Sequence, residues 1–92
     1  MITAIVMVHT AADRIPETAQ AIADLDGVSE VYSCAGDVDL IAVVKVSEHA
    51  QLADVIAGGL SKVEGVRRTD THIAFRSYNR AQTEAAFSLG LD

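Results

Sequence analysis

The segment at residues 40–46 has the sequence LIAVVKV, and it decides the fold because its apolar residues continue without polar alternation. A short run of this kind, rich in β-branched residues, is typical of a strand that is buried on both faces. A similar run, ITAIVMV, occupies residues 2–8, which lie 38 positions earlier in the chain. The two runs therefore divide the chain into two halves with the same organisation.

The offset of 38 residues also relates other positions of the two halves. Gly27 and Gly65 are equivalent at this offset, and each supplies the positive-φ position that ends a helix. The segments after both glycines begin with valine, as the start of a further strand would. Seven residue pairs are identical at this offset: Ala4/Ala42, Val6/Val44, Val8/Val46, Ala12/Ala50, Ala19/Ala57, Gly27/Gly65 and Val28/Val66.

Between its strand and its glycine, each half has apolar residues at three- and four-residue spacing, which is typical of an amphipathic helix. In the first half we expect Asp13 to be the N-cap and Pro16 to lie in the first turn. In the second half we expect the helix to follow Ser47. The apolar positions are Ile15, Ala19, Ile22 and Leu25 in the first half and Leu52, Ile56, Leu60 and Val63 in the second.

Two βαβ units joined by a short loop predict an α+β fold, the ferredoxin-like βαββαβ sandwich, in which two helices cover one face of an antiparallel sheet. The strands at residues 2–8 and 40–46 are nevertheless apolar on both faces. The uncovered face therefore needs a partner, and the same face of a second copy is the simplest one. We expect a homodimer that forms through the sheet.

The chain of 92 residues has room for one domain with one core. We place the ferredoxin-like domain at residues 1–78 and a C-terminal tail at residues 79–92. The tail is Ala-rich and closes in apolar residues, which indicates either a short helix that docks on a neighbouring subunit or a frayed end.

Thirteen acidic residues against seven basic ones give a net charge of −6, so we expect no direct DNA binding by this chain alone. Cys34 is the one cysteine and cannot form an intramolecular disulfide, which fits a reducing compartment; the cytoplasm is the expected location. No apolar segment is long enough to span a membrane, so we expect no membrane partner.

The sequence has no Ser-His-Asp ordering, phosphate-binding loop or CxxC motif, so we expect no enzyme and no catalytic residue. His9, His49 and His72 lie on different predicted elements without ligand-like spacing. We therefore expect no metal site, and no cofactor is implied.

The loop Gly36-Asp37-Val38-Asp39 lies between two predicted strands and is the first candidate for a site. Its glycine frees backbone N–H groups, and its two carboxylates are suited to an ammonium group. The alternative is a hairpin turn with solvated acids. Thr69 and Thr71 alternate on the last strand, where their hydroxyls either hydrogen-bond a carboxylate or serve strand packing.

Two segments resemble the effector-binding domain of Lrp/AsnC-type regulators: VYSCAGDVDLI at residues 31–41 and LSKVEGVRRTDTHI at residues 60–73. That family has a G-x-x-D loop before the third strand and a Gly-Val turn leading into a Thr-containing fourth strand. The match covers residues 1 to about 76. Gly36 and Asp39 take the loop positions, Asp37 lies inside the loop, and Thr69 and Thr71 take the strand positions.

The resemblance implies a stand-alone form without the helix-turn-helix, since Met1 directly precedes the first strand. It implies dimers that assemble into an octamer-like ring, with an amino acid or related small molecule bound between dimers. Full-length Lrp/AsnC regulators are further candidate partners. The implied ligand-binding residues are Gly36, Asp37, Asp39, Thr69 and Thr71, with Asp39 either facing the ligand's ammonium group or ordering the loop.

Two other classes stay open at this point. A small dimeric α+β barrel enzyme requires a cavity within one dimer that is lined by His or acidic side chains. An amino-acid sensor module of the ACT kind shares the βαββαβ order.

Overall fold

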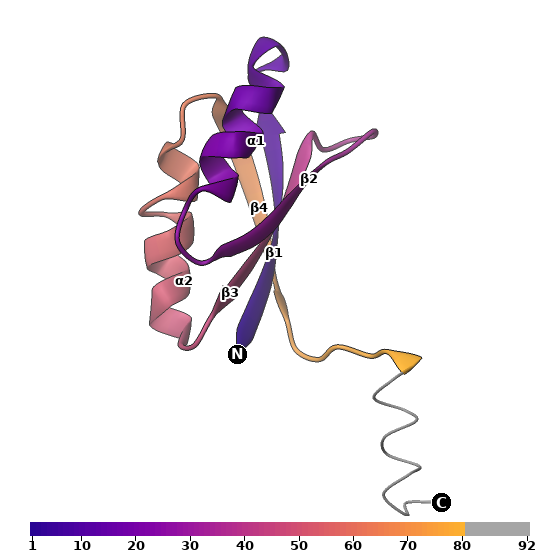
Figure 1. Cartoon of the computed structure of the whole chain (residues 1–92), viewed down its shortest axis with the longest axis vertical. Coiled ribbons are helices and arrows are strands. Elements are labelled where there is room, and N and C mark those ends of the chain that lie inside the picture. Colours follow the sequence, from indigo (N-terminus) through magenta and orange to yellow (C-terminus); the bar gives the residue numbers. More distant parts are fainter. Residues whose placement is uncertain (81–92) are drawn as a thin grey trace, which may run out of the picture.

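A computed structural model describes residues 1–80 of the chain and confirms the ferredoxin-like α+β fold (Figure 1). The helices are α1 (Ile15–Ala23) and α2 (His49–Ile56), and two 3-10 turns, η1 and η2, lie at Ala12–Arg14 and Leu60–Lys62. The strands are β1 (Ile2–Thr10), β2 (Val28–Ser33), β3 (Leu40–Val46) and β4 (Val66–Ala74).

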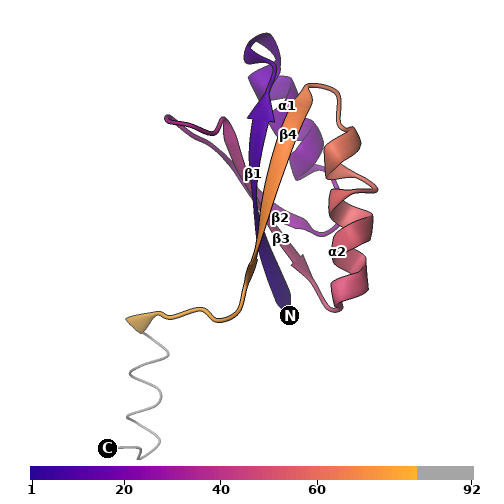
Figure 2. The same cartoon turned by 180° about the vertical axis from the view of Figure 1, so that it is seen from behind.

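The four strands form one antiparallel sheet in the order β2-β3-β1-β4. The two runs that open the halves, β1 and β3, are therefore the central strands and pair with each other, with Val6 opposite Ala42. Both helices lie against the same face of the sheet, as the two opposite views show (Figures 1 and 2).

The core lies between the helices and this face of the sheet. Alternate residues of the central strands point into it because side chains along a strand alternate between faces. These residues and the helix side chains that meet them are almost completely buried: Ala4, Val6, Val8, Leu40, Ala42, Val44, Ile22, Leu52 and Leu60.

The predicted helix boundaries are partly wrong. Asp13 lies in η1 rather than at the N-cap of α1, which is Arg14 and makes no capping side-chain bond. The second apolar series is not one helix, because α2 ends at Ile56 and Leu60 belongs to η2. Two consecutive glycines, at residues 58 and 59, separate them, and glycine is the weakest helix former after proline.

Gly27 and Gly65 take the predicted positive φ, at 93° and 99°. Gly65 also allows a close approach, because a Cβ there would collide with the Thr18 hydroxyl oxygen of α1. The turn before β4 is thus held directly against the first helix.

Within residues 1–80, the second face of the sheet has no helix over it. Its centre consists of Ile5, Met7, Ile41 and Val43, which are half-buried or exposed although they are as apolar as the core residues beside them. The sequence prediction that one face remains open is confirmed for the single chain.

Beyond Ala74 the described chain leaves the body of the domain (Figure 1). Phe75 is 99% exposed. The predicted tail helix falls mainly on residues 81–92, which lie outside the described residues. Within residues 1–80, no helix has both the length and the apolar character that crossing a bilayer requires.

Candidate functional site

Four of the five predicted site residues lie toward the end of the sheet where β1 ends and β3 and β4 begin, whereas Thr71 lies opposite Val6 in the middle of β1. The loop between β2 and β3 spans residues 34–39 and meets the last residues of β1 there. Thr69 is close to the start of β4, opposite Val8 of β1. The fold therefore brings the loop and the first threonine to one end of the molecule.

Asp39 ties the loop to β1 through backbone and side chain. Its N–H donates to the Val8 carbonyl at 3.1 Å, and its carbonyl accepts from the Cys34 N–H at 2.9 Å. Its carboxylate accepts a hydrogen bond from the backbone N–H of Thr10 at 2.8 Å. In a single chain, Asp39 therefore orders the loop. A contact of Asp39 with the ammonium group of a ligand stays a prediction.

Gly36 and Asp37 form the exposed tip of this loop. Gly36 has a φ of 127°, which strongly favours glycine, and apart from its chain neighbours no described residue has an atom within 4 Å of the position a Cβ would take. Asp37 is exposed. The tip is therefore held out from the sheet by Asp39 and is open to a ligand or to another subunit.

Thr69 and Thr71 lie on the helix-facing side of β4, opposite Val8 and Val6. Thr69 is half-buried and Thr71 is exposed. β1 separates them from β3, and two strand spacings correspond to about 10 Å. Within one chain only Thr69 shares the end of the sheet with the loop, and the threonines and the loop do not form one enclosed pocket.

A neighbouring hollow of about 300 Å³ lies between the start of α1 and the start of β4. It is lined by Ala11, Arg14, Glu64, Gly65, Val66 and Arg67, and by none of the predicted site residues. Sequence reasoning did not identify this hollow, because its two arginines are far apart in the chain.

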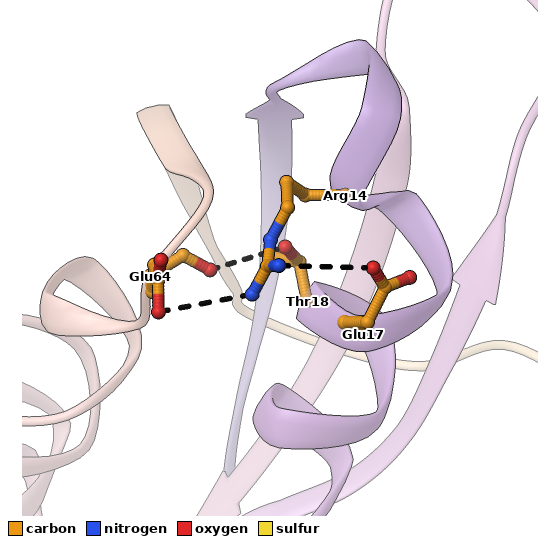
Figure 3. Close-up of polar contacts among 4 residues, drawn as sticks. All are labelled: Arg14, Glu17, Thr18 and Glu64. Carbon is orange, nitrogen blue, oxygen red and sulfur yellow. Dashed lines mark hydrogen bonds and ion pairs between the residues drawn. The ribbon is translucent and has the colours of Figure 1, made fainter.

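Arg14 joins α1 to the turn before β4 (Figure 3). Its guanidinium lies 3.9 Å from Glu17 and 3.7 Å from Glu64, and the Thr18 hydroxyl donates to the Glu64 carbonyl at 3.1 Å. Because both glutamates already balance the arginine and are exposed, we interpret the group as a structural tie rather than as an anion site.

Within residues 1–80, no three His, Cys, Asp or Glu side chains are grouped so that they could hold a metal ion. His72 is paired with Asp70 at 3.5 Å, and His9 lies 3.4 Å from Arg68; both histidines are on β1 or β4 and project from the open face. On the opposite edge of that face, Tyr32 donates a hydrogen bond to Glu30.

The sheet, the loop and the glycine turn together match one class of protein. Residues 3–83 match the family described as the Lrp/AsnC ligand binding domain, and the chain belongs to this family. This assignment decides against the ACT-like alternative. The relatives of the chain include both short proteins of similar size and longer regulators.

Among solved structures, the chain resembles TTHA0845 from Thermus thermophilus, with 44% identity and a TM-score of 0.81 over 87% of this chain and 100% of that one. It is 32% identical over 72 residues to the HTH-type transcriptional regulator LrpA1 of Halobacterium salinarum, covering 78% of this chain and 49% of LrpA1. The chain spans less than half the length of the curated relatives that it matches.

A transcriptional regulator from Neisseria meningitidis, NMB0573, was solved as a complex with L-Met. It shares the fold, with a TM-score of 0.75, 14% identity, and coverage of 86% of this chain and 53% of that one.

Proposed function

We propose that this chain is an amino-acid-sensing regulatory domain of the Lrp/AsnC type, and that its ligand binds at the loop Gly36–Asp39 with help from Thr69 and Thr71. The observation that carries the proposal is the tie between Asp39 and Thr10, which holds the tip of the loop exposed at the end of the sheet. Family membership and the L-Met complex of a structural relative support a small-molecule ligand.

The ligand binds between subunits in this proposal. Small-molecule sites bury most of the ligand surface, whereas Gly36, Asp37 and Thr71 are exposed in a single chain. A second dimer that packs on this end of the sheet supplies the missing wall. The octamer-like ring expected from the family resemblance is one assembly that provides such a contact.

The dimer itself forms through the open face of the sheet in this proposal. Ile5, Met7, Ile41 and Val43 form a contiguous apolar centre, which is the kind of surface that a soluble protein covers. The same four side chains argue against the barrel-enzyme alternative, because they fill the space between two sheets that a catalytic cavity would need.

Regulation is indirect in this proposal, since the net charge of −6 opposes phosphate binding. Mixed assembly with full-length Lrp/AsnC regulators in the cytoplasm is the proposed route to DNA. Electrophoretic mobility shifts with this chain alone at physiological salt should show no specific complex, and a sequence-specific shift would contradict this part.

The test of the ligand site begins with thermal melts of the chain in the presence of each of the twenty amino acids. A ligand that binds only the folded state raises the melting temperature. Titration calorimetry with the stabilising amino acid then compares wild type with Asp37→Asn and Asp39→Asn. Asparagine at position 39 keeps an oxygen that accepts from the Thr10 N–H, so Asp39→Asn removes the charge without untying the loop.

A direct ionic hydrogen bond contributes about 1.5 to 3 kcal/mol, so losing it should weaken binding by about one to two orders of magnitude. Thr69→Val and Thr71→Val test the carboxylate end of the ligand, with Thr3→Val on the open face as the matched control. Stabilisation by no amino acid would contradict amino-acid sensing. Unchanged affinity in all four site variants would place the ligand elsewhere.

A further inference from the structure

The hollow between the start of α1 and the start of β4 is lined by more positive than negative charge. Arg14 and Arg67 each contribute a guanidinium group, whereas Glu64 is the one acidic residue among the described residues of the lining. The chain as a whole carries a net charge of −6. Because a local excess of positive charge attracts anions, the hollow is the place on this acidic chain where we look for an anionic ligand.

A β-bulge places Arg67 beside the hollow. The register between β1 and β4 shifts after His9, so that Arg67 is an extra residue of β4 and has no partner on β1. Such bulges change the direction of a side chain and are common beside functional sites. Within residues 1–80, the Arg67 side chain forms no hydrogen bond and no ion pair. Its charge is therefore not balanced by a neighbouring carboxylate.

Arg14 ties α1 to the turn before β4 but keeps unused hydrogen-bond donors (Figure 3). Its ion pairs with Glu17 and Glu64 measure 3.9 and 3.7 Å, and both distances exceed the length of a hydrogen bond. Its Nε is buried and has no acceptor among residues 1–80. Buried donors in folded proteins are nearly always hydrogen-bonded. The two glutamates thus balance the charge of Arg14 without satisfying its N–H groups.

Backbone groups fix the two sides of the hollow to each other. The N–H of Ala11 donates to the Gly65 carbonyl at 2.9 Å, and the Thr18 hydroxyl donates to the Glu64 carbonyl at 3.1 Å. Both bonds join the segment around the start of α1 to the turn before β4. A site that is formed before its ligand arrives loses less free energy to ordering when the ligand binds.

We propose that this hollow binds a small oxyanion, a carboxylate or a phosphate group, between Arg67 and Arg14. Guanidinium groups bind both kinds of oxyanion through paired N–H donors. The volume of about 300 Å³ is at the lower end of the range for ligand pockets, which favours a small ligand. Arg67 supplies the unbalanced charge, and Arg14 supplies further donors. The inference does not depend on the amino-acid ligand proposed at the loop Gly36–Asp39.

Titrations followed by the amide resonances of Gly65 and Arg67 test the site. The probes are sodium phosphate and sodium succinate, and sodium chloride at the same ionic strength controls for screening. We expect a saturable shift with at least one probe, and the probe that binds more tightly identifies which oxyanion the hollow prefers. No saturable shift, or the same shift with chloride, would overturn the inference.

Replacement of the unpaired arginine should remove most of the affinity. Arg67→Gln should weaken binding of the preferred probe by about ten- to hundredfold, the loss expected for a hydrogen bond to a charged group. Arg68→Gln is the matched control, because Arg68 is the next residue but contacts His9 on the open face. It should change the affinity less than about threefold. Equal losses in the two variants would indicate general attraction to a basic surface and would contradict a site in the hollow.

Removal of the carboxylate that lines the hollow should have the opposite effect. Glu64→Gln keeps the backbone carbonyl that accepts from Thr18, so the tie to α1 remains. It should strengthen binding about two- to fivefold, the size expected for an exposed charge pair. Glu30→Gln, on β2, changes the net charge equally and should leave the affinity unchanged. The same gain in both variants would contradict a local effect of Glu64.

A comparison with the loop separates this inference from the proposed function. Asp39→Asn should leave binding of the preferred oxyanion unchanged, because Asp39 does not line the hollow. A chain that binds the oxyanion but responds to no amino acid would contradict the proposed function alone. A chain that responds to an amino acid at the loop but binds neither phosphate nor succinate would overturn this inference alone.

Discussion

Alternate residues of β1 have opposite environments on the two faces of the sheet. Ala4, Val6 and Val8 are completely buried beneath the helices, whereas Ile5 between them is 37% exposed. The neighbouring strand β3 repeats this difference, with Ala42 buried and Ile41 half-buried. The side chains on the two faces are equally apolar, so their chemistry does not explain the difference.

The difference shows that one chain completes only one of its two apolar faces. α1 and α2 cover the first face, and no element among residues 1–80 covers the second. In the proposed dimer, Ile5, Met7, Ile41 and Val43 contribute to association, whereas their neighbours contribute to folding. Substitutions matched for chemistry but placed on opposite faces test this division.

The largest effects are expected from isoleucine truncations. Ile22→Ala, in the completely buried side chain of α1, should lower the free energy of unfolding by about 2 to 5 kcal/mol because it leaves a cavity. Ile5→Ala removes the same atoms from the open face. It should instead weaken the proposed dimer by about ten- to hundredfold, because in that dimer the lost contact lies between subunits.

Urea unfolding measures the first effect, and sedimentation equilibrium measures the second. Equal losses of unfolding free energy in both variants, with an unchanged dimer constant, would show that the open face is not an interface.

The next largest difference in stability is expected between two glycine substitutions, one packed against α1 and one at the exposed loop tip. Gly65→Ala strains a φ of 99° and places a methyl group against the buried Thr18, so we expect a loss of about 2 to 4 kcal/mol. Gly36→Ala strains a φ of 127° in open space and should cost about 1 kcal/mol. Thermal melts compare the two variants.

The double variant Thr18→Ala/Gly65→Ala separates strain from collision. It should recover part of the Gly65→Ala loss, because the colliding hydroxyl is gone. A strictly additive double variant would assign the whole effect to backbone strain.

The sequence predicted the strands and the open face because hydrophobic period and β-branched composition are local properties. It also predicted the positive φ of Gly27 and Gly65, although α2 already ends at Ile56. The start of α1 was missed because tertiary contacts decide it: Ala11 donates to the Gly65 carbonyl, and η1 follows before the α-helix begins.

The site was predicted less completely than the fold. Spacing located the loop at Gly36–Asp39, but the bond between Asp39 and Thr10 joins residues 29 positions apart and leaves no trace in a local pattern. The polar pairs on β2 and β4 differ in this respect, because Glu30 and Tyr32, like Asp70 and His72, are two residues apart on one strand and are therefore local.

Removal of the Asp39 tie should have an intermediate effect on stability. Asp39→Ala leaves the half-buried Thr10 N–H without its acceptor, so we expect a loss of about 1 to 3 kcal/mol. Asp39→Asn retains an acceptor and should lose less than about 1 kcal/mol. Urea unfolding of the two variants checks this, and equal losses would mean that charge rather than hydrogen bonding holds the loop.

The smallest effect concerns ionisation at the edge of the open face. The hydrogen bond to Glu30, and then the negative charge of Glu30, raise the pKa of Tyr32 above its ordinary value of 10.0. Because the folded-state pKa is the higher one, the bond contributes to stability below about pH 10 and is lost as the pH rises through the folded-state pKa.

Glu30→Gln should therefore lower the pKa of Tyr32, as followed by tyrosinate absorbance in a Tyr78→Phe background that leaves one tyrosine. Glu48→Gln, on the helix layer, should leave the titration unchanged. If Glu30→Gln does so too, Tyr32 and Glu30 do not form a pair in solution.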